Sequence, residues 1–193
     1  MSKRRHSKGQ SALGSIRIIA GKHRGRKLPV LNADGLRPTT DRVKETLFNW
    51  LIPYIQDSRC LDCYAGAGSL GFEAISRGAS EVTLFELNTN AVKQLKANTQ
   101  LLKINNADIV QGDTLALLAK PSTPYDIVFV DPPFRQGLTE KTLSFLNQGW
   151  LADKALIYVE METDKPDSKV PANWQLLKEK VAGQVAYRLY QAA

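Results

Sequence analysis

Four residues, Asp131-Pro132-Pro133-Phe134, directly follow the apolar run 127–130 and carry the most chemical information in the chain. Because proline cannot donate a backbone hydrogen bond and fixes its own φ, the two prolines end the strand and hold Asp131 on a rigid corner. The corner combines a fixed hydrogen-bond acceptor with an aromatic ring, Phe134, that can stack. This pairing suits a flat ring with an exocyclic amine, such as adenine, guanine or cytosine.

A glycine-rich segment forms a second candidate site. Gly66, Gly68 and Gly71 make a G-x-G-x-x-G pattern after an expected strand and before an expected helix. The glycines allow a tight turn and let a ligand approach the backbone. Glu86 ends the next expected strand, twenty residues after Gly66, where a carboxylate binds ribose hydroxyls. Both NAD and S-adenosylmethionine use such contacts, so this pattern alone does not choose between them.

Two further acids favour S-adenosylmethionine. Asp62 ends the strand before the glycines, where methyltransferases place an acid near the methionine amino group or its bound water. Asp113 follows the third strand, where an acid can accept the adenine amino group. The alternative for each acid is a helix N-cap. NAD chemistry lacks a candidate hydride-transfer partner, because both histidines, His6 and His23, lie in the basic N-terminal segment.

Combined, the two sites indicate methyl transfer to the amine of a base, with Asp131, Pro132, Pro133 and Phe134 as the catalytic residues. The exocyclic nitrogen is a poor nucleophile because its lone pair is delocalised into the ring. The Asp131 carboxylate and the Pro132 carbonyl can each accept an N–H, which favours the more tetrahedral, more positive nitrogen of the transition state. Phe134 stacks on the ring, and positioning supplies the larger effect. The alternative is a proline-rich turn with a packed phenylalanine.

Alternating strand and helix patterns must position these residues. The expected strands are 59–63, 81–86, 107–111, 127–131 and 155–160, and the expected helices are 69–77, 89–103, 113–119 and 138–148. Strands separated by helices predict βαβ units and a parallel sheet. The last two expected strands, 174–180 and 184–190, are separated only by a short turn and should pair antiparallel. This predicts an α/β, Rossmann-like class I methyltransferase fold, with a mostly parallel seven-stranded sheet that ends in an antiparallel hairpin.

The N-terminal quarter carries the basicity of the chain. Residues 1–44 hold twelve Lys and Arg against two acids, whereas the rest has a net charge of −3. Such a segment fits nucleic acid, and the alternative is a solvated tail. Strands over 15–20 and 27–30 should form a hairpin, followed by a helix from Thr39 or Thr40 to Leu51. The expected RNA phosphate contacts are Arg17, Lys22, Arg24, Arg26 and Lys27.

Three expectations concern organisation and environment. We expect a flexible basic tail over 1–14, an RNA-contacting hairpin and helix over 15–52, and a methyltransferase domain over 53–193. The sequence has no run of ~18 apolar residues and no apolar signal segment, so we expect a cytoplasmic protein that is not bound to a membrane. Cys60 and Cys63 have C-x-x-C spacing, which favours packed, reduced cysteines over a zinc or redox site, and we expect no metal.

Five segments resemble the RsmD-type bacterial 16S ribosomal RNA guanine-N2 methyltransferases, nearly end to end. They are 19–28 (IAGKHRGRKL), 36–51 (LRPTTDRVKETLFNWL), 61–71, 129–134 and 170–191 (VPANWQLLKEKVAGQVAYRLYQ). The second and last segments are far more specific to the family than the general methyltransferase motifs. Ala20 is a departure, since many members have glycine there.

The resemblance implies a substrate and a cofactor. The substrate is a guanine of 16S rRNA, presented in an assembled or assembling small ribosomal subunit, and S-adenosylmethionine is held by Gly66, Gly68, Glu86 and Asp113. Arg37 and Arg42 are each expected either at the RNA or at the methionine carboxylate, with the RNA favoured for Arg37 and the carboxylate for Arg42. The Asp131 corner alone serves adenine-N6 methylation of DNA or RNA at least as naturally, so the choice of guanine rests on the resemblance. A non-catalytic RNA-binding assembly factor is the remaining alternative, and we expect a monomer.

Overall fold

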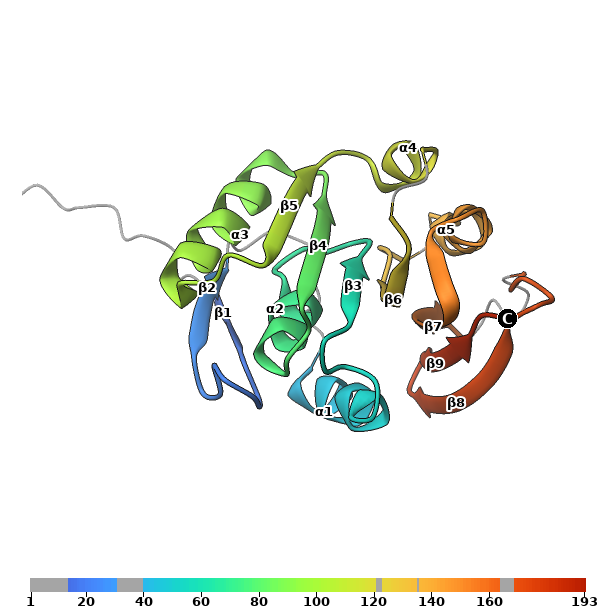
Figure 1. Ribbon diagram of the computed structural model, residues 1–193, viewed down its shortest axis with the longest axis horizontal. Helices are drawn as coiled ribbons and strands as arrows, with labels where there is room; N and C mark the ends of the chain where they lie inside the picture. The colour runs from blue at the N-terminus through green and yellow to red at the C-terminus, as the bar shows by residue number, and fades with distance from the viewer. Residues whose placement is uncertain (1–13, 31–39, 121–122, 135, 164–168) are drawn as a thin grey trace, which may run out of the picture.

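The computed structural model describes residues 14–30, 40–120, 123–134, 136–163 and 169–193 (Figure 1). Arg37, Thr39 and all of the expected tail except Gly14 lie outside these ranges. The elements are β1 (Gly14–Arg17), β2 (Lys27–Val30), α1 (Asp41–Leu51), β3 (Arg59–Asp62), α2 (Ser69–Ser76), β4 (Glu81–Glu86), α3 (Thr89–Leu102), β5 (Ala107–Gln111), α4 (Thr114–Leu118), β6 (Tyr125–Val130), α5 (Leu138–Leu146), β7 (Leu151–Glu162), β8 (Gln175–Ala182) and β9 (Val185–Gln191).

The central sheet has seven strands in the order β5-β4-β3-β6-β7-β9-β8. The first five strands in this order are parallel, and β9 pairs antiparallel with both β7 and β8. The predicted fold class is therefore confirmed, including the final antiparallel hairpin. The separate pair β1–β2 is the expected N-terminal hairpin.

Two boundaries differ from the sequence-based expectation by three residues or more, and several others by one or two. The strand expected over 15–20 ends at Arg17, because the backbone N–H groups of Ile19 and Ala20 donate to the Glu73 carboxylate instead of to a strand. Strand β7 begins at Leu151 rather than at residue 155. Its register against β6 shifts before Leu156, and Lys154 in that irregular stretch has φ +57. A bulge of this kind puts polar residues inside a strand, so the sequence looks like a turn there.

Both faces of the sheet are buried at its central strands, β3, β6 and much of β7. Ile127 and Phe129 pack into a core shared with α1, α2, α3 and the hairpin, whereas Val128 and Val130 pack with α4 and α5. Figure 1 shows these helices on their two sides of the sheet. Strands covered on both faces are apolar at consecutive positions. Cys60 and Cys63 fall into different cores as free, buried thiols, as expected, and burial raises the pKa of Cys60 to about 12.

The N-terminal hairpin is docked on α2 through polar contacts. The fully buried Glu73 carboxylate accepts from the N–H groups of Ile19 (2.8 Å) and Ala20 (3.1 Å) and from Arg77 Nε (2.7 Å). The Lys22 N–H donates to the carbonyl of Ser76 at 2.7 Å. Because a buried carboxylate is stable only when it is paired and hydrogen-bonded, Glu73 ties the hairpin to the sheet domain.

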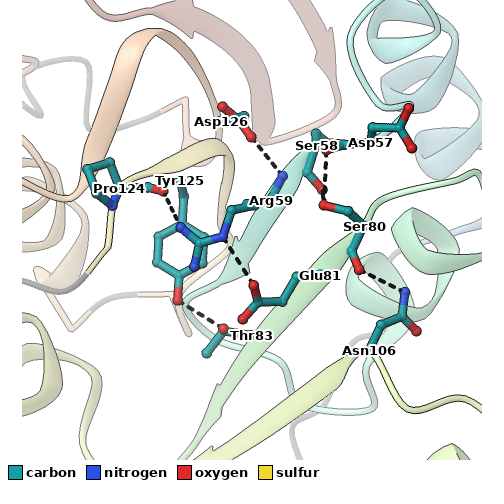
Figure 2. A network of polar contacts seen from close by, with 10 residues as sticks. All are labelled: Asp57, Ser58, Arg59, Ser80, Glu81, Thr83, Asn106, Pro124, Tyr125 and Asp126. Atoms are coloured by element: carbon teal, nitrogen blue, oxygen red, sulfur yellow. Dashed lines mark hydrogen bonds and ion pairs between the residues drawn. The ribbon is translucent and has the colours of Figure 1, made fainter.

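The amino-terminal edge of the sheet is held by Arg59, as Figure 2 shows. Its N–H donates to Asp126 (2.8 Å), its Nε to Glu81 (3.1 Å) and its Nη1 to the carbonyl of Pro124 (2.8 Å). The guanidinium also lies 5.1 Å from the centre of the Tyr125 ring. These contacts connect β3, β4 and β6 at this edge.

Candidate active site

The predicted site residues meet at the carboxyl ends of neighbouring parallel strands. Glu86 is the last residue of β4, Asp62 is the last residue of β3, and Asp131 directly follows β6. In the sheet, Asp62 pairs with Leu84 on one side and with Phe129 on the other. Open α/β sheets bind ligands at this edge. The sheet therefore brings together the glycine loop and the Asp131 corner, which lie about sixty residues apart in the chain.

The glycine loop is held by the strand-ending acid. The Gly66 N–H donates to Glu86 Oε2 at 2.8 Å, and the Asn88 N–H donates to Glu86 Oε1 at 2.7 Å. Gly68 has φ +78, and a Cβ there would lie 2.5 Å from the Phe72 ring and 2.7 Å from Leu95. Both the backbone conformation and the packing thus require glycine at residue 68. Contacts within the chain therefore shape the loop.

Asp62 is buried beneath this loop. It is 2% exposed, and its Oδ2 accepts from the Gly71 N–H at 3.2 Å. Burial, together with the charge of Asp131, raises the pKa of Asp62 to about 7, although hydrogen bonds from the Gly71 and Tyr64 backbone oppose the shift. The two carboxylates therefore lie close enough to interact, which joins the loop and the corner electrostatically.

Asp113 caps a helix, which is the alternative role that its sequence position allowed. It is the N-cap of α4, and its Oδ1 accepts from the Ala116 N–H at 2.9 Å. The side chain is exposed and stands just beyond β5, whose last residue pairs with Glu86. Capping engages one carboxylate oxygen, so a contact with an adenine amino group stays a prediction for this residue.

Sequence reasoning did not select Leu87, which directly follows Glu86 and is 65% exposed. An exposed leucine at the ligand-binding edge offers an apolar surface for a flat ring. In the sequence, the feature that could have identified Leu87 is its position directly after Glu86, the acid that ends β4.

The Asp131 corner is partly open to solvent. Asp131 is half-buried, Pro132 is buried, and Phe134 is 37% exposed. On the neighbouring strand β7, Tyr158 OH donates to Glu160 Oε1 at 2.9 Å, and both side chains are buried. Sequence reasoning missed this pair. The signal was two polar residues, two positions apart, inside the apolar stretch 156–161.

The expected phosphate-binding residues lie away from this edge. Lys22, Arg24 and Arg26 are exposed on the hairpin tip, which docks on Ser76 at the end of α2. Because α2 begins at the glycine loop and has eight residues, the tip lies about 12 Å down the helix from the loop. Arg26 Nη2 also donates to the carbonyl of Leu101, at the end of α3. Figure 1 shows the tip near the amino-terminal ends of β3 and β4.

The other described cationic residues predicted to contact RNA or cofactor lie on the hairpin and on α1. Arg17 and Lys27 are exposed register partners in the hairpin, at the end of the strands nearer the tip. Arg42 is exposed in the first turn of α1. Among the described residues, no group of His, Cys, Asp and Glu is arranged to hold a metal ion, and no helix has the length and apolarity to cross a membrane.

Known proteins match this chain over most of its length. A sequence family described as conserved hypothetical protein 95 matches residues 16–191. The ribosomal RNA small subunit methyltransferase D of Escherichia coli strain K12 is 59% identical over 94% of this chain and 92% of its own length. The protein of the same name from Haemophilus influenzae is 56% identical, over 94% of this chain and 96% of its own length. The chain belongs to the ribosomal RNA small subunit methyltransferase D family.

The fold agrees with membership of this family. A solved structure described as a putative methyltransferase from Escherichia coli superimposes with a TM-score of 0.88 at 57% identity, and it covers 93% of this chain and 98% of that one. The family match spans the glycine loop, the Asp131 corner and the pair Tyr158–Glu160 on β7. The match therefore includes both halves of the candidate site.

Proposed function

We propose that this methyltransferase transfers a methyl group from S-adenosylmethionine to the exocyclic N2 of a guanine in 16S rRNA. The observation that carries the proposal is the placement of the glycine loop and the Asp131 corner on adjacent strands, β3 and β6, at one edge of the sheet. One half is shaped for a nucleoside-type cofactor and the other for an amine-bearing base. The relatives' names, which specify small-subunit ribosomal RNA, support the choice of substrate.

The residues present fit S-adenosylmethionine. Gly66 and Gly68 leave the backbone of the loop open to close approach, and Glu86 offers carboxylate oxygens for ribose hydroxyls. Ser69, at the start of α2, has a buried Oγ without a hydrogen-bond partner, which a polar ligand group or a water would satisfy. Leu87 supplies an apolar surface for the adenine. When bound, the cofactor supplies an activated methyl group on a positively charged sulfur.

The residues of the corner orient the acceptor amine. The Asp131 carboxylate and the Pro132 carbonyl each accept an N–H hydrogen bond, and Phe134 stacks on the ring. These contacts strengthen as positive charge develops on the nitrogen. Asp131 is half-buried, so a proton that leaves the amine can pass from its carboxylate to solvent. Asp62, whose pKa is raised to about 7, is partly protonated near neutral pH, which reduces its repulsion of the Asp131 charge.

Phosphate contacts from the basic hairpin supply affinity for RNA. The tip lies about 12 Å down α2 from the carboxyl-terminal edge of the sheet, so an RNA that contacts the tip and places its base at the Asp131 corner must extend along the protein. We propose 16S rRNA within an assembled or assembling subunit as the substrate. We further propose that the enzyme is monomeric, acts in the cytoplasm, and has Asp62, Asp113 and Arg42 near the cofactor.

Two measurements test this function. Calorimetry should show S-adenosylmethionine binding to the wild type and binding at least about tenfold weaker to Glu86→Gln, because one loop acceptor is lost. Labelled methyl transfer is then compared on 16S rRNA within subunits and on naked 16S rRNA. Absence of cofactor binding would favour the non-catalytic assembly factor. Transfer that is confined to adenine would favour the adenine-N6 alternative.

A further inference from the structure

A second carboxylate lies beside Asp131, and the proposed chemistry does not use it. Val130 of β6 and Val159 of β7 are register partners in parallel strands. Asp131 and Glu160 each follow these partners by one residue, so they stand next to each other at the carboxyl edge of the sheet. The sequence separates them by almost thirty residues, which hides the pairing.

The two carboxylates also share a face of the sheet. Phe129 and Tyr158, two residues before them, both pack into the core beneath α1 and α2. Because side chains alternate along a strand, Glu160 lies on the same face as Tyr158, and Asp131 continues the face of Phe129. The charge of Asp131 acts on Tyr158, which agrees with this arrangement.

Tyr158 fixes the position of Glu160. Its OH donates to Glu160 Oε1 at 2.9 Å, and the two side chains are 0% and 7% exposed. Burial, followed by the charge of Glu160 and the hydrogen bond to it, raises the pKa of Tyr158 far above its ordinary value. The phenol therefore stays a donor, and it holds the carboxylate in one orientation. A buried carboxylate in an apolar strand is costly, so its presence there favours a specific role.

The strand order sets where a base must lie. Glu160 is on the side of Asp131 away from β3 and its glycine loop. A base that holds its amine at Asp131, with the nitrogen toward the glycine loop, places its ring over β7 and Glu160. In guanine the carbon that bears the N2 amine is flanked by N3, an acceptor, and by N1–H, a donor on the Watson–Crick edge. In adenine the position next to the N6 amine is N1 without a proton, an acceptor.

We propose that Glu160 accepts the N1–H of the target guanine and thereby selects guanine over adenine, with Tyr158 as its positioning residue. This rests on the proposed function and adds what the Asp131 corner alone does not provide. A carboxylate facing N1 gains a charge-assisted hydrogen bond from guanine. The same carboxylate meets a lone pair in adenine, which leaves two buried acceptors opposed.

The probe that tests this is 16S rRNA with 2-aminopurine in place of the target guanine. The analogue keeps the exocyclic amine, but its N1 is an acceptor. It is introduced by splinted ligation, and the RNA is assembled into subunits if naked RNA is not methylated. Wild-type protein should prefer guanine over 2-aminopurine by about 10- to 100-fold in kcat/KM. The Kd ratio for the two RNAs, measured without methyl donor, should favour guanine as well.

The decisive variant is Glu160→Gln, whose amide can donate to the analogue's N1. The guanine preference should fall at least tenfold or reverse, in both kcat/KM and Kd, with S-adenosylmethionine affinity unchanged. Tyr158→Phe nearly conserves volume and should also reduce the preference for guanine over 2-aminopurine. If Glu160→Gln does not fold, Tyr158→Phe alone is used for the test. Glu81→Gln, at the opposite edge of the sheet, makes the same chemical change and should leave the preference intact.

The outcomes separate this inference from the proposed function. If the wild type forms N2-methylguanosine but the guanine preference is the same in wild type and both variants, Glu160 does not read the base and the inference alone is wrong. If the wild type forms a different methylated nucleoside, the proposed function is wrong and the inference is overturned with it.

Discussion

Two glycines of the hairpin tip provide a matched test of how the hairpin is docked. Gly21 and Gly25 both have φ +81, so alanine at either position is strained by the left-handed backbone alone, by about 1–2 kcal/mol. A Cβ on Gly25 meets nothing within 4 Å. A Cβ on Gly21 would lie 1.8 Å from the Ser76 carbonyl oxygen, which is backbone and cannot rotate away. Comparing Gly25→Ala with Gly21→Ala therefore separates the cost of backbone strain from the cost of displacing the hairpin tip.

The expected difference follows from the contacts around Ser76. Displacing the tip breaks the hydrogen bond from the Lys22 N–H to the Ser76 carbonyl (2.7 Å). It also breaks those from the His23 N–H to Ser76 Oγ (2.9 Å) and from Ser76 Oγ to the Ala20 carbonyl (2.5 Å). At about 1 kcal/mol for each bond, Gly21→Ala should cost about 3 kcal/mol more than Gly25→Ala.

Urea unfolding followed by circular dichroism measures both variants against the wild type. We expect Gly25→Ala to lower the free energy of unfolding by about 1–2 kcal/mol and Gly21→Ala by about 4–5 kcal/mol. S-adenosylmethionine affinity should be retained in the folded Gly21→Ala protein, because the glycine loop lies at the opposite end of α2. Equal losses in the two variants would refute the docking described for the tip.

Three further outcomes are expected. Asp131→Asn should reduce kcat at least about 100-fold with little change in cofactor affinity, measured by single-turnover methyl transfer and calorimetry. Equal losses of kcat and of cofactor affinity would mean that the Asp131 corner has only a structural role. The raised pKa of Asp62 favours the folded state below the unfolded pKa near 3.8, and this contribution is lost as pH rises through about 7. Urea unfolding at several pH values should show that loss in the wild type but not in Asp62→Asn. The double variant Lys22→Gln, Arg24→Gln should make the plot of log RNA affinity against log salt concentration less steep, by about 1.4 in slope. An unchanged slope would show that the tip does not contact RNA phosphates.

Much of the fold follows from local sequence patterns. The bounds expected for β4 and β5 match the structure, because each is a short strand between a turn and a helix start. The final hairpin was predictable from the short Gly183-containing turn between its strands. The early end of β1 was not, because the Glu73 carboxylate that captures the next N–H groups comes from a helix more than fifty residues away.

The site was predictable in part, for a related reason. Strand-ending acids and glycines carry local signals, so Asp62, Gly68 and Glu86 were selected from sequence. Glu160 was not, because its significance depends on the register between β6 and β7, which no local pattern specifies. The distance between the hairpin tip and the glycine loop likewise depends on which end of α2 the tip contacts. Charge in the sequence indicated a nucleic-acid surface but not its location.

The identity of the methylated nucleoside tests the central claim most directly. The purified protein is incubated with isotopically labelled S-adenosylmethionine and small ribosomal subunits that lack the modification, and the RNA is digested to nucleosides for mass spectrometry. The account predicts labelled N2-methylguanosine from one position of 16S rRNA, and none with Asp131→Asn. Labelled N6-methyladenosine, or no labelled nucleoside from either subunits or naked RNA, would contradict it.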